Sequence, residues 1–218
     1  MQTISKFRGI IAVALFLLTI VSTATAKYGG GTGTADDPYQ IATAADLIAL
    51  GNSPGDYDKH FILTADIDLS PNLPGRKVFT KAVIAPDNDP LKDYFQGTSF
   101  TGVFDGNSHT ILNLTITGGG YLGLFGQLGQ WRAGGEVKNL GAVDANIAGS
   151  GNYVAGLVGY NGRNSSITLS YSTGAITGNN DVGGLVGVNY GSITTSYSTG
   201  TVNGDGYVGG LAGFNDGS

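Results

Sequence analysis

The pentapeptide SYSTG occurs at Ser170–Gly174 and again at Ser196–Gly200, an offset of 26 residues. Both copies lie inside longer segments that resemble one another. These segments are Tyr153–Gly178, Asp181–Gly204 and Tyr207–Ser218, with weaker copies at His109–Gly118, Tyr121–Gln127 and Glu136–Gly149. A spacing of 26 to 28 residues between equivalent positions is typical of a repeat architecture.

The composition of the repeats favours short strands over helices. The segments are rich in Gly, Ser, Asn and β-branched residues, which disfavour an α-helix. A period of about 26 residues is also short for a propeller blade or a helical-pair repeat. Three short strands joined by turns would use one period, and coils stacked about 4.8 Å apart would pair them in parallel. We therefore predict an all-β fold, a right-handed parallel β-helix, or β-solenoid.

Aligning the copies predicts which side chains point into the solenoid. Two columns begin with apolar residues and end with small ones, so we assign them to the interior. They are Leu114, Leu140, Ser170 and Ser196, and Ile116, Ala142, Ser172 and Ser198. Because side chains alternate along a strand, the column between them faces outward. That column is Thr115, Gly141, Tyr171 and Tyr197.

Asn161, Asn189 and Asn215 follow the Leu-x-Gly block in successive copies. Stacked amides can donate and accept between coils, and Asn tolerates the left-handed conformation of a sharp turn. We predict a structural Asn ladder here; the alternative is a set of solvent-facing loop residues. The sequence alone does not indicate which side chains of the Gly-Gly-Leu-Val-Gly block point into the core.

Residues 27–99 lack the period and contain most of the Asp, Lys and Pro residues. We interpret them as an N-terminal cap and lead-in to a solenoid at residues 100–218. Thr43–Gly51 predicts one short helix with Thr43 as N-cap and Asp46 in its first turn. His60–Ser70 predicts a strand, and Leu69–Asp93 a long excursion. The last coil stops at Ser218, partway through the repeat, so we expect a fragment or a longer natural product.

Residues 1–26 have the features of a secretory signal peptide. Lys6 and Arg8 precede the apolar run Gly9–Val21, and an A-x-A cleavage signal lies at Ala24–Ala26. An uncleaved anchor is the alternative; we expect no membrane span once the signal is removed. The absence of Cys suits a bacterial exported protein without disulfides. We therefore expect a secreted or cell-surface location.

Charge and composition exclude several classes of protein. Charged residues make up 12% of the chain and hydrophobic residues 41%, which argues against intrinsic disorder. Gly is abundant, with 38 residues, but follows no G-X-Y period, which argues against collagen. The formal net charge is −5 without a basic cluster, so we expect no nucleic-acid partner.

The repeat at Gly183–Gly204, GGLVGVNYGSITTSYSTGTVNG, resembles the GLUG motif. The upstream stretch Phe100–Ile116 and the region around TAADLIAL and FILTADIDLS resemble segments that usually precede such repeats. GLUG repeats are found in bacterial exported proteins, including adhesin-like surface proteins and immunoglobulin A-cleaving metallopeptidases. The resemblance implies a β-helical surface or secreted module and supplies no catalytic residues. His60 and His109 are far apart, and no H-E-x-x-H motif is present.

Few residues are candidates for catalysis or metal binding. Asp66 and Asp68 share one strand face about 6.5–7 Å apart, near the carboxyl spacing of inverting glycosidases, but we favour a structural role at the first coil. Asp87, Asp89 and Asp93 are weak candidates for calcium, since the spacing lacks the Gly and terminal Glu of an EF-hand. Asp181 and Asp205 are placed at equivalent turns, as solvated carboxylates or weak calcium ligands. We expect no other cofactor.

The outward column suggests a ligand surface. Tyr171 and Tyr197 could contact sugar rings or another protein, although a cross-coil pair that only stabilises the sheet is the simpler interpretation. We expect a non-enzymatic surface module for adhesion, whose partner is a polysaccharide or a protein. The alternatives are a polysaccharide-degrading β-helix and a stalk for a further C-terminal domain, such as a peptidase.

Overall fold

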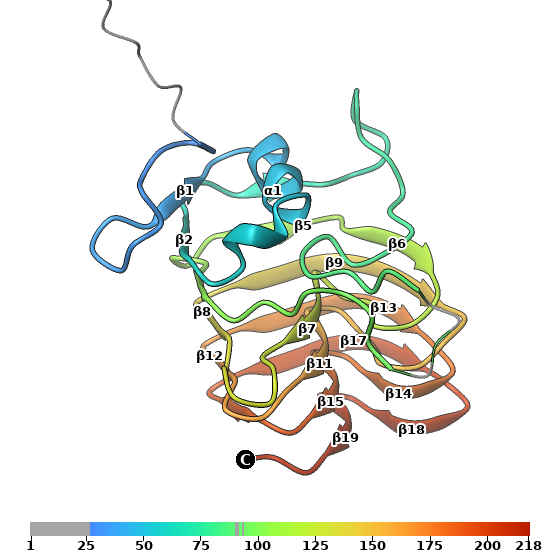
Figure 1. Cartoon of the computed structure of the whole chain (residues 1–218). Helices are drawn as coiled ribbons and strands as arrows, with labels where there is room; N and C mark the ends of the chain where they lie inside the picture. Colours follow the sequence, from blue (N-terminus) through green and yellow to red (C-terminus); the bar gives the residue numbers. More distant parts are fainter. Residues whose placement is uncertain (1–26, 90–91, 93) are drawn as a thin grey trace, which may run out of the picture.

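The computed structural model describes residues 27–89, 92 and 94–218, and within them the chain forms a parallel β-solenoid of about four turns with one α-helix (Figure 1). This confirms the predicted fold class. The predicted signal peptide at residues 1–26 lies outside the described residues. The described residues contain no helix that is both long and apolar enough to cross a membrane.

The strands of the described residues stack into four parallel sheets, so that each coil contributes to several sheets in turn. The first sheet contains β1 (Tyr39–Ile41), β2 (His60–Leu63), β4 (Val103–Asp105), β8 (Glu136–Lys138), β12 (Ser166–Thr168) and β16 (Ser192–Thr194). The second contains β3 (Ile67–Asp68), β5 (Thr110–Leu112), β9 (Gly141–Gly149), β13 (Tyr171–Thr177) and β17 (Tyr197–Asn203), with β6 (Thr115–Gly118) also paired to β9. The third contains β7 (Phe125–Leu128), β11 (Val158–Asn161), β15 (Val186–Asn189) and β19 (Ala212–Asn215). The fourth contains β10 (Val154–Ala155), β14 (Asn180–Gly183) and β18 (Gly206–Gly209).

The register of β13 against β17 explains the repeated pentapeptide. Tyr171 pairs with Tyr197, and Ser172 pairs with Ser198. One sequence period is therefore one coil. The same register holds in the other sheets, where Val154, Val182 and Val208 align.

The interior side chains become smaller from the N-terminal coils of the solenoid to the C-terminal coils. On the first sheet the inward column runs through Phe61, Phe104, Val137, Ile167 and Ile193. The Phe104 ring meets Phe125 edge-on, with ring centroids 5.4 Å apart. Burying each such side chain contributes about 1.5–3 kcal/mol, so the N-terminal coils hold most of the hydrophobic stabilisation.

Small interior residues are needed where two sheets approach closely. A Cβ added at Gly156 would overlap the hydroxyl of Ser172, which is itself buried. The Gly-Gly-Leu-Val-Gly block at 183–187 is buried along its length, with Leu185 and Val186, like the preceding Val182, at 0% exposure. The chain bends within this block, so the side chains of Leu185 and Val186 both enter the core although they are adjacent in the sequence.

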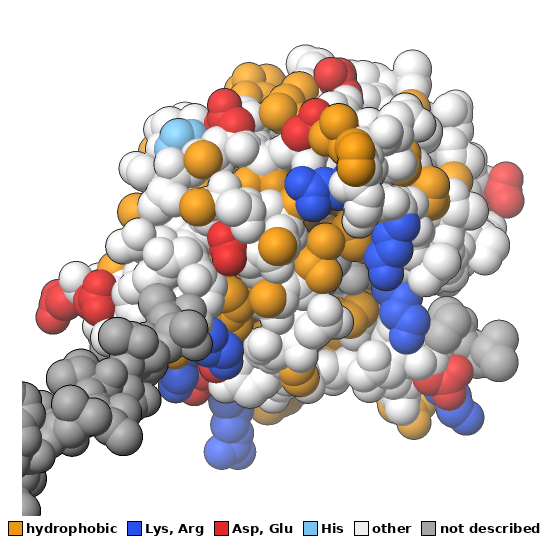
Figure 2. All heavy atoms as spheres, turned by 90° about the horizontal axis from the view of Figure 1, so that it is seen from above, with side chains coloured by type: hydrophobic (Ala, Val, Ile, Leu, Met, Phe, Trp, Pro, Cys, Tyr) orange, Lys and Arg blue, Asp and Glu red, His pale blue; other side chains and the backbone are white. Residues whose placement is uncertain are grey.

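The helix α1 (Ala44–Gly51) covers the first coil (Figure 1). The Thr43 hydroxyl accepts the Asp46 N–H at 3.2 Å and the Asp46 carboxylate accepts the Thr43 N–H at 2.9 Å, forming a capping box. A short 3-10 turn, η1 (Pro54–Asp56), follows. Seen from above, this end of the molecule carries charged side chains of both signs among scattered hydrophobic ones (Figure 2). Such a surface shields the sheet edge beneath it from pairing with another chain.

The predicted alignment of the segment His109–Gly118 was wrong by five residues. Gly141 pairs with Thr110 rather than Thr115, and Ala142 pairs with Ile111 rather than Ile116. Ile116 instead aligns with Ile147, and the carbonyl of Leu114 accepts the N–H of Asn146, so Leu114 does not lie over Leu140. Asn113 adopts a φ of 56°, which divides the segment into β5 and β6. Simple alternation does not continue through that break, although Leu114 and Ile116 are buried as expected.

The predicted excursion contributes to the solenoid wall. Phe79 pairs with Ile116 and Ile84 pairs with Phe125, both in parallel. Further along the chain, Phe100 pairs with Leu128. The segment therefore supplies short pairings to an early coil.

Candidate functional site

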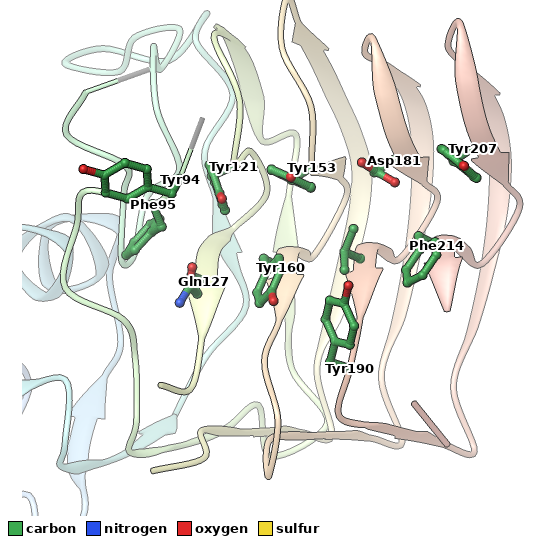
Figure 3. A pocket seen from close by; sticks show the side chains of 11 residues that line it. Tyr94, Phe95, Tyr121, Gln127, Tyr153, Tyr160, Asp181, Tyr190, Tyr207 and Phe214 are labelled. Carbon is green, nitrogen blue, oxygen red and sulfur yellow. The ribbon is translucent and has the colours of Figure 1, made fainter. Parts of the chain in front are cut away.

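An open groove of about 530 Å³ runs along one side of the solenoid (Figure 3). We call it the aromatic groove, because most of its lining side chains are Tyr or Phe. They are Tyr94, Phe95, Tyr121, Gln127, Tyr153, Tyr160, Asp181, Val188, Tyr190, Tyr207 and Phe214. The residues come from successive coils, so the long direction of the groove follows the solenoid axis (Figure 3).

One wall of the groove is a column of residues at a single corner of the solenoid. It consists of Tyr121, Tyr153, Asp181 and Tyr207, each directly before a residue of an aligned apolar column. All four have a positive φ, between 51° and 64°. A left-handed conformation is costly for a bulky residue such as Tyr, by about 1–2 kcal/mol. Such strained residues concentrate at functional sites, which favours a role for this column.

The second wall comes from the third sheet. Gln127, Tyr160, Val188 and Phe214 are in register in β7, β11, β15 and β19. These four side chains line the groove, whereas Val158 and Val186, two residues earlier in the same strands, are fully buried, so simple alternation does not describe this sheet. Figure 3 shows the two rows facing the same space.

The rings form a continuous series of contacts. The centroids of Tyr121 and Tyr153 are 4.6 Å apart, and those of Tyr153 and Tyr160 are 6.0 Å apart. Further pairs join Tyr160 to Tyr190 at 5.6 Å, Tyr190 to Phe214 at 5.8 Å, and Phe214 to Tyr207 at 6.0 Å. These distances suit edge-to-face and tilted packing, so the rings hold one another in place.

Charge in the groove is concentrated at Asp181. Burial raises the pKa of the Tyr121 and Tyr160 hydroxyls above their ordinary value of 10.0, so both remain neutral. Burial also raises the pKa of the Asp181 carboxyl above 3.8. Arg163 lies over the Tyr190 ring, 5.7 Å from its centroid, and marks one edge of the groove.

A smaller hollow of about 140 Å³ adjoins the groove at Gln127 and Tyr160, and Trp131 and Arg163 line it. Trp131 is the single Trp of the chain and is 84% exposed. An exposed indole beside a Tyr-lined groove extends the aromatic surface available to a ligand.

Residues 178–203 match the family model for the GLUG motif. The chain carries a GLUG motif. This match confirms the resemblance on which the repeat was recognised. The matched segment spans all of β14, β15, β16 and β17, so the GLUG repeat supplies Asp181, Val188 and Tyr190 to the groove.

Two curated relatives are similar to part of this chain. Halomucin from Haloquadratum walsbyi is 38% identical over 170 residues, which is 75% of this chain and 2% of halomucin. A protein described as a Gly-rich membrane protein from Evansella cellulosilytica is 38% identical over 116 residues, 52% of this chain and 12% of that protein. The chain thus corresponds to a small part of each relative.

A solved structure has a similar fold. It is a crystal structure of a protein described as an immunoglobulin A1 protease from Bacteroides ovatus, with a TM-score of 0.53 and 21% identity. The match covers 87% of this chain and 65% of that one. At this identity the similarity shows the solenoid fold alone.

Tyr171 and Tyr197, the predicted ligand column, lie on the second sheet and outside the aromatic groove. Their rings stack with centroids 5.0 Å apart and an interplanar angle of 2°. Tyr171 also lies over Gly141, where an added Cβ would meet its ring at 2.6 Å. A Tyr covering a strand Gly protects the sheet, which favours the stabilising interpretation of this pair.

The Asn residues that follow the Leu-x-Gly block form a hydrogen-bonded series. The Asn161 amide donates to Oδ1 of Asn189 at 2.7 Å, and the Asn189 amide donates to Oδ1 of Asn215 at 2.6 Å. Asn161 and Asn189 are fully buried. These contacts connect three coils inside the GLUG region.

Asp66 and Asp68 connect the lead-in to the next coil. Asp66 Oδ1 accepts the N–H of Thr110 at 2.8 Å and lies 3.2 Å from Nδ1 of His109. Asp68 Oδ1 accepts the N–H of Ser70 at 2.8 Å and the amide of Asn113 at 3.0 Å. The Thr110 bond lowers the pKa of Asp66, and the Asn113 bond lowers that of Asp68. Both carboxylates are thus occupied by structural contacts.

The three predicted calcium candidates, Asp87, Asp89 and Asp93, do not form a metal site among the residues that the structure describes. Asp87 is buried and its Oδ1 accepts the N–H of Gln96 at 2.7 Å, while Asp93 lies outside the described residues. Among the residues that are described, no group of three or more His, Cys, Asp or Glu side chains is arranged around a possible metal, and Asp89 joins no such group.

The equivalence of Asp181 and Asp205 was wrong. Asp181 aligns with Tyr207, because Val182 pairs with Val208, and Asp205 lies two residues earlier in an exposed loop. Asp181 is a half-buried groove residue rather than a solvated turn carboxylate.

The sequence contains a signal for the groove that strand alternation does not reveal. Tyr153, Asp181 and Tyr207 each precede the Val of a repeat, and seven residues later come Tyr160, Val188 and Phe214. The first residue of each such pair lies in one wall of the groove and the second lies in the other wall. The first wall lies at a solenoid corner, where the left-handed backbone makes the inside-outside alternation uninformative.

Proposed function

We propose that this protein is a secreted or surface-exposed repeat module that binds a glycan, without catalysis, in the aromatic groove. The observation that carries the proposal is the continuous series of rings around a single carboxylate on an open wall of the solenoid. The partner class is a polysaccharide, with adhesion to a glycan-coated surface as the biological use.

The chemistry of the groove suits sugars. The C–H faces of a pyranose ring are apolar and pack on aromatic rings, while its hydroxyls need hydrogen-bond partners. The Tyr hydroxyls, Gln127 and Asp181 supply donors and acceptors along the same wall. Tyr presents a large contact area with few rotatable bonds, so little entropy is lost on binding. A groove open along the axis accommodates a chain rather than a single sugar.

The surface location is supported by the relatives and by the N-terminal residues. One relative carries the name halomucin and the other is described as a membrane protein, and each is 38% identical to part of this chain. The signal-like segment at residues 1–26 is consistent with export.

The lining chemistry favours binding over hydrolysis. Most glycoside hydrolases use two carboxyl groups on either side of the bond that is cleaved. In the groove as described, Asp181 is the one carboxylate in the lining, and Asp66 and Asp68 are hydrogen-bonded elsewhere. These arrangements support a non-enzymatic module.

A polysaccharide panel tests the proposal. The purified protein is screened for retardation in gels containing soluble polysaccharides, beside the double variant Tyr153→Ala with Tyr160→Ala. We expect retardation by at least one polysaccharide and a loss of about tenfold in affinity in the double variant, since each ring contributes about 0.5–1.5 kcal/mol. Tyr171→Ala with Tyr197→Ala is the matched control. Binding that survives the groove variant but not the control variant would move the site to the second sheet.

A further inference from the structure

Asp181 interrupts a column that otherwise contains only Tyr. Tyr121 and Tyr153 occupy the same corner in the two preceding coils, and Tyr207 occupies it in the next. The backbone is equivalent at all four positions, with φ values of 52°, 64°, 54° and 51°. The exchange therefore changes the side chain alone, and it places a carboxylate between two Tyr residues (Figure 3).

The carboxylate of Asp181 has no partner within the described part of the chain. Burial is the cause of its raised pKa, and neither a hydrogen bond nor a neighbouring charge contributes. The guanidinium of Arg163, at the edge of the groove, lies over the Tyr190 ring. A partly desolvated carboxylate without a partner is unfavourable in the empty protein, because burial removes water without replacing its hydrogen bonds.

The surrounding rings add to the attraction for a cation. The face of an aromatic ring is negative and attracts ammonium groups, and the attraction is stronger where water is excluded. Tyr153 and Tyr207 lie on either side of Asp181 along the column, and Phe214 lies on the opposite wall (Figure 3). A carboxylate flanked by aromatic rings in a groove favours a positively charged ligand group over a neutral one.

We infer that the ligand of the groove is a glycan with protonated amino groups, one of which lies against Asp181 between the rings. The inference rests on the proposed function and specifies its ligand class. The sugar rings pack on the Tyr column along the solenoid axis, and the amine neutralises Asp181. A neutral glycan that donates a hydroxyl to Asp181 is the competing possibility.

Two probes that differ in charge separate these possibilities. Oligomers of glucosamine and of N-acetylglucosamine, matched in length, are titrated into the intact protein at about pH 6, where the free amine is protonated. We expect the glucosamine oligomer to bind about tenfold more tightly or better, as expected for a desolvated cation among aromatic rings. Equal binding, or tighter binding of the acetylated oligomer, would overturn the inference.

Substitutions assign the preference to Asp181. Asp181→Asn preserves the shape and the left-handed backbone, so it should abolish the preference while retaining residual binding of both oligomers. Asp181→Tyr, which continues the column, should do the same. Asp205→Asn removes the same charge from an exposed loop outside the groove and should leave the preference unchanged. Equal losses in Asp181→Asn and Asp205→Asn would indicate general electrostatic attraction and would refute the assignment.

The result also separates this inference from the proposed function. If neither oligomer binds but a neutral polysaccharide does, and the Tyr153→Ala with Tyr160→Ala variant weakens it, the groove is a glycan site and the amino-sugar inference is wrong. If no glycan binds, both are wrong.

Discussion

Gly184 lies directly against the hydroxyl of Ser198 inside the solenoid, and an added Cβ at Gly184 would overlap both that hydroxyl and the carbonyl oxygen of Gly210. The same contact joins Gly156 to Ser172 one coil earlier. The serines of the SYSTG pentapeptide and the glycines of the GGLVG block are thus two halves of one packing arrangement.

Gly184→Ala should destabilise the protein by about 1–3 kcal/mol, because the methyl group forces the backbone of neighbouring coils apart. Gly210 is the matched control, since it is the equivalent position in the next coil and nothing lies within 4 Å of an added Cβ there. Gly210→Ala should change the free energy of unfolding by less than about 0.5 kcal/mol. Urea denaturation measures both, and equal effects would contradict this packing.

Asn189→Ala should cost about 1–3 kcal/mol, because it removes the acceptor of the buried Asn161 amide and the donor to Asn215. Asn215 is exposed, so water can replace the hydrogen bond that it accepts from Asn189. Asn215→Ala should therefore lower the free energy of unfolding by less than about 1 kcal/mol. Thermal unfolding of the two variants compares the positions. A loss of stability in Asn189→Ala that is equal to or smaller than the loss in Asn215→Ala would contradict a stabilising role for the buried Asn ladder.

Asp66 and Asp68 should make the first coil sensitive to acid. Their folded pKa values are lowered by hydrogen bonds, so the folded state binds fewer protons than the unfolded state near the ordinary value of 3.8. Their contribution is complete above that value and is lost as the pH falls through the folded pKa. The melting temperature should therefore fall below about pH 4, and less steeply in Asp66→Asn with Asp68→Asn. An unchanged slope would refute the linkage.

Asp181→Asn should raise the melting temperature at neutral pH. The folded pKa of Asp181 is raised, so the folded state holds its proton more tightly and the charged group costs stability once the pH exceeds that pKa. Asn removes the charge and tolerates the φ of 54°. Scanning calorimetry measures the change, with Asp205→Asn as the control that should not shift. A lower melting temperature in Asp181→Asn would mean that its carboxylate has a stabilising partner.

The solenoid could be predicted from the sequence because its repeat is nearly uniform from Tyr153 onward. Equivalent residues there do lie over one another, as the Tyr171–Tyr197 register shows. The helix at Thr43 was also predictable, since the capping box is a local signal. Where the repeat degenerates, two registers fit the pattern of HTILNLTITG equally well, and the break at Asn113 decides between them.

The candidate site was harder to predict than the fold. Alternation rules led to Tyr171 and Tyr197, which lie on the second sheet, whereas one wall of the groove is built where the chain turns a corner. Its column begins at Tyr121 and Tyr153, in left-handed conformations that are unusual for Tyr. Propensity scales do not anticipate such positions. The recurrence of an aromatic residue at one fixed place in each coil is the better guide.

The most direct test of the account is to locate the ligand. Backbone amide chemical shifts are recorded while a glycan selected from the panel is added to the intact protein. We predict that the shifts concentrate at Tyr153, Tyr160 and Asp181 and leave Tyr171 and Tyr197 unchanged. Shifts concentrated at Tyr171 and Tyr197, with the groove unaffected, would show that the aromatic groove is not the binding site.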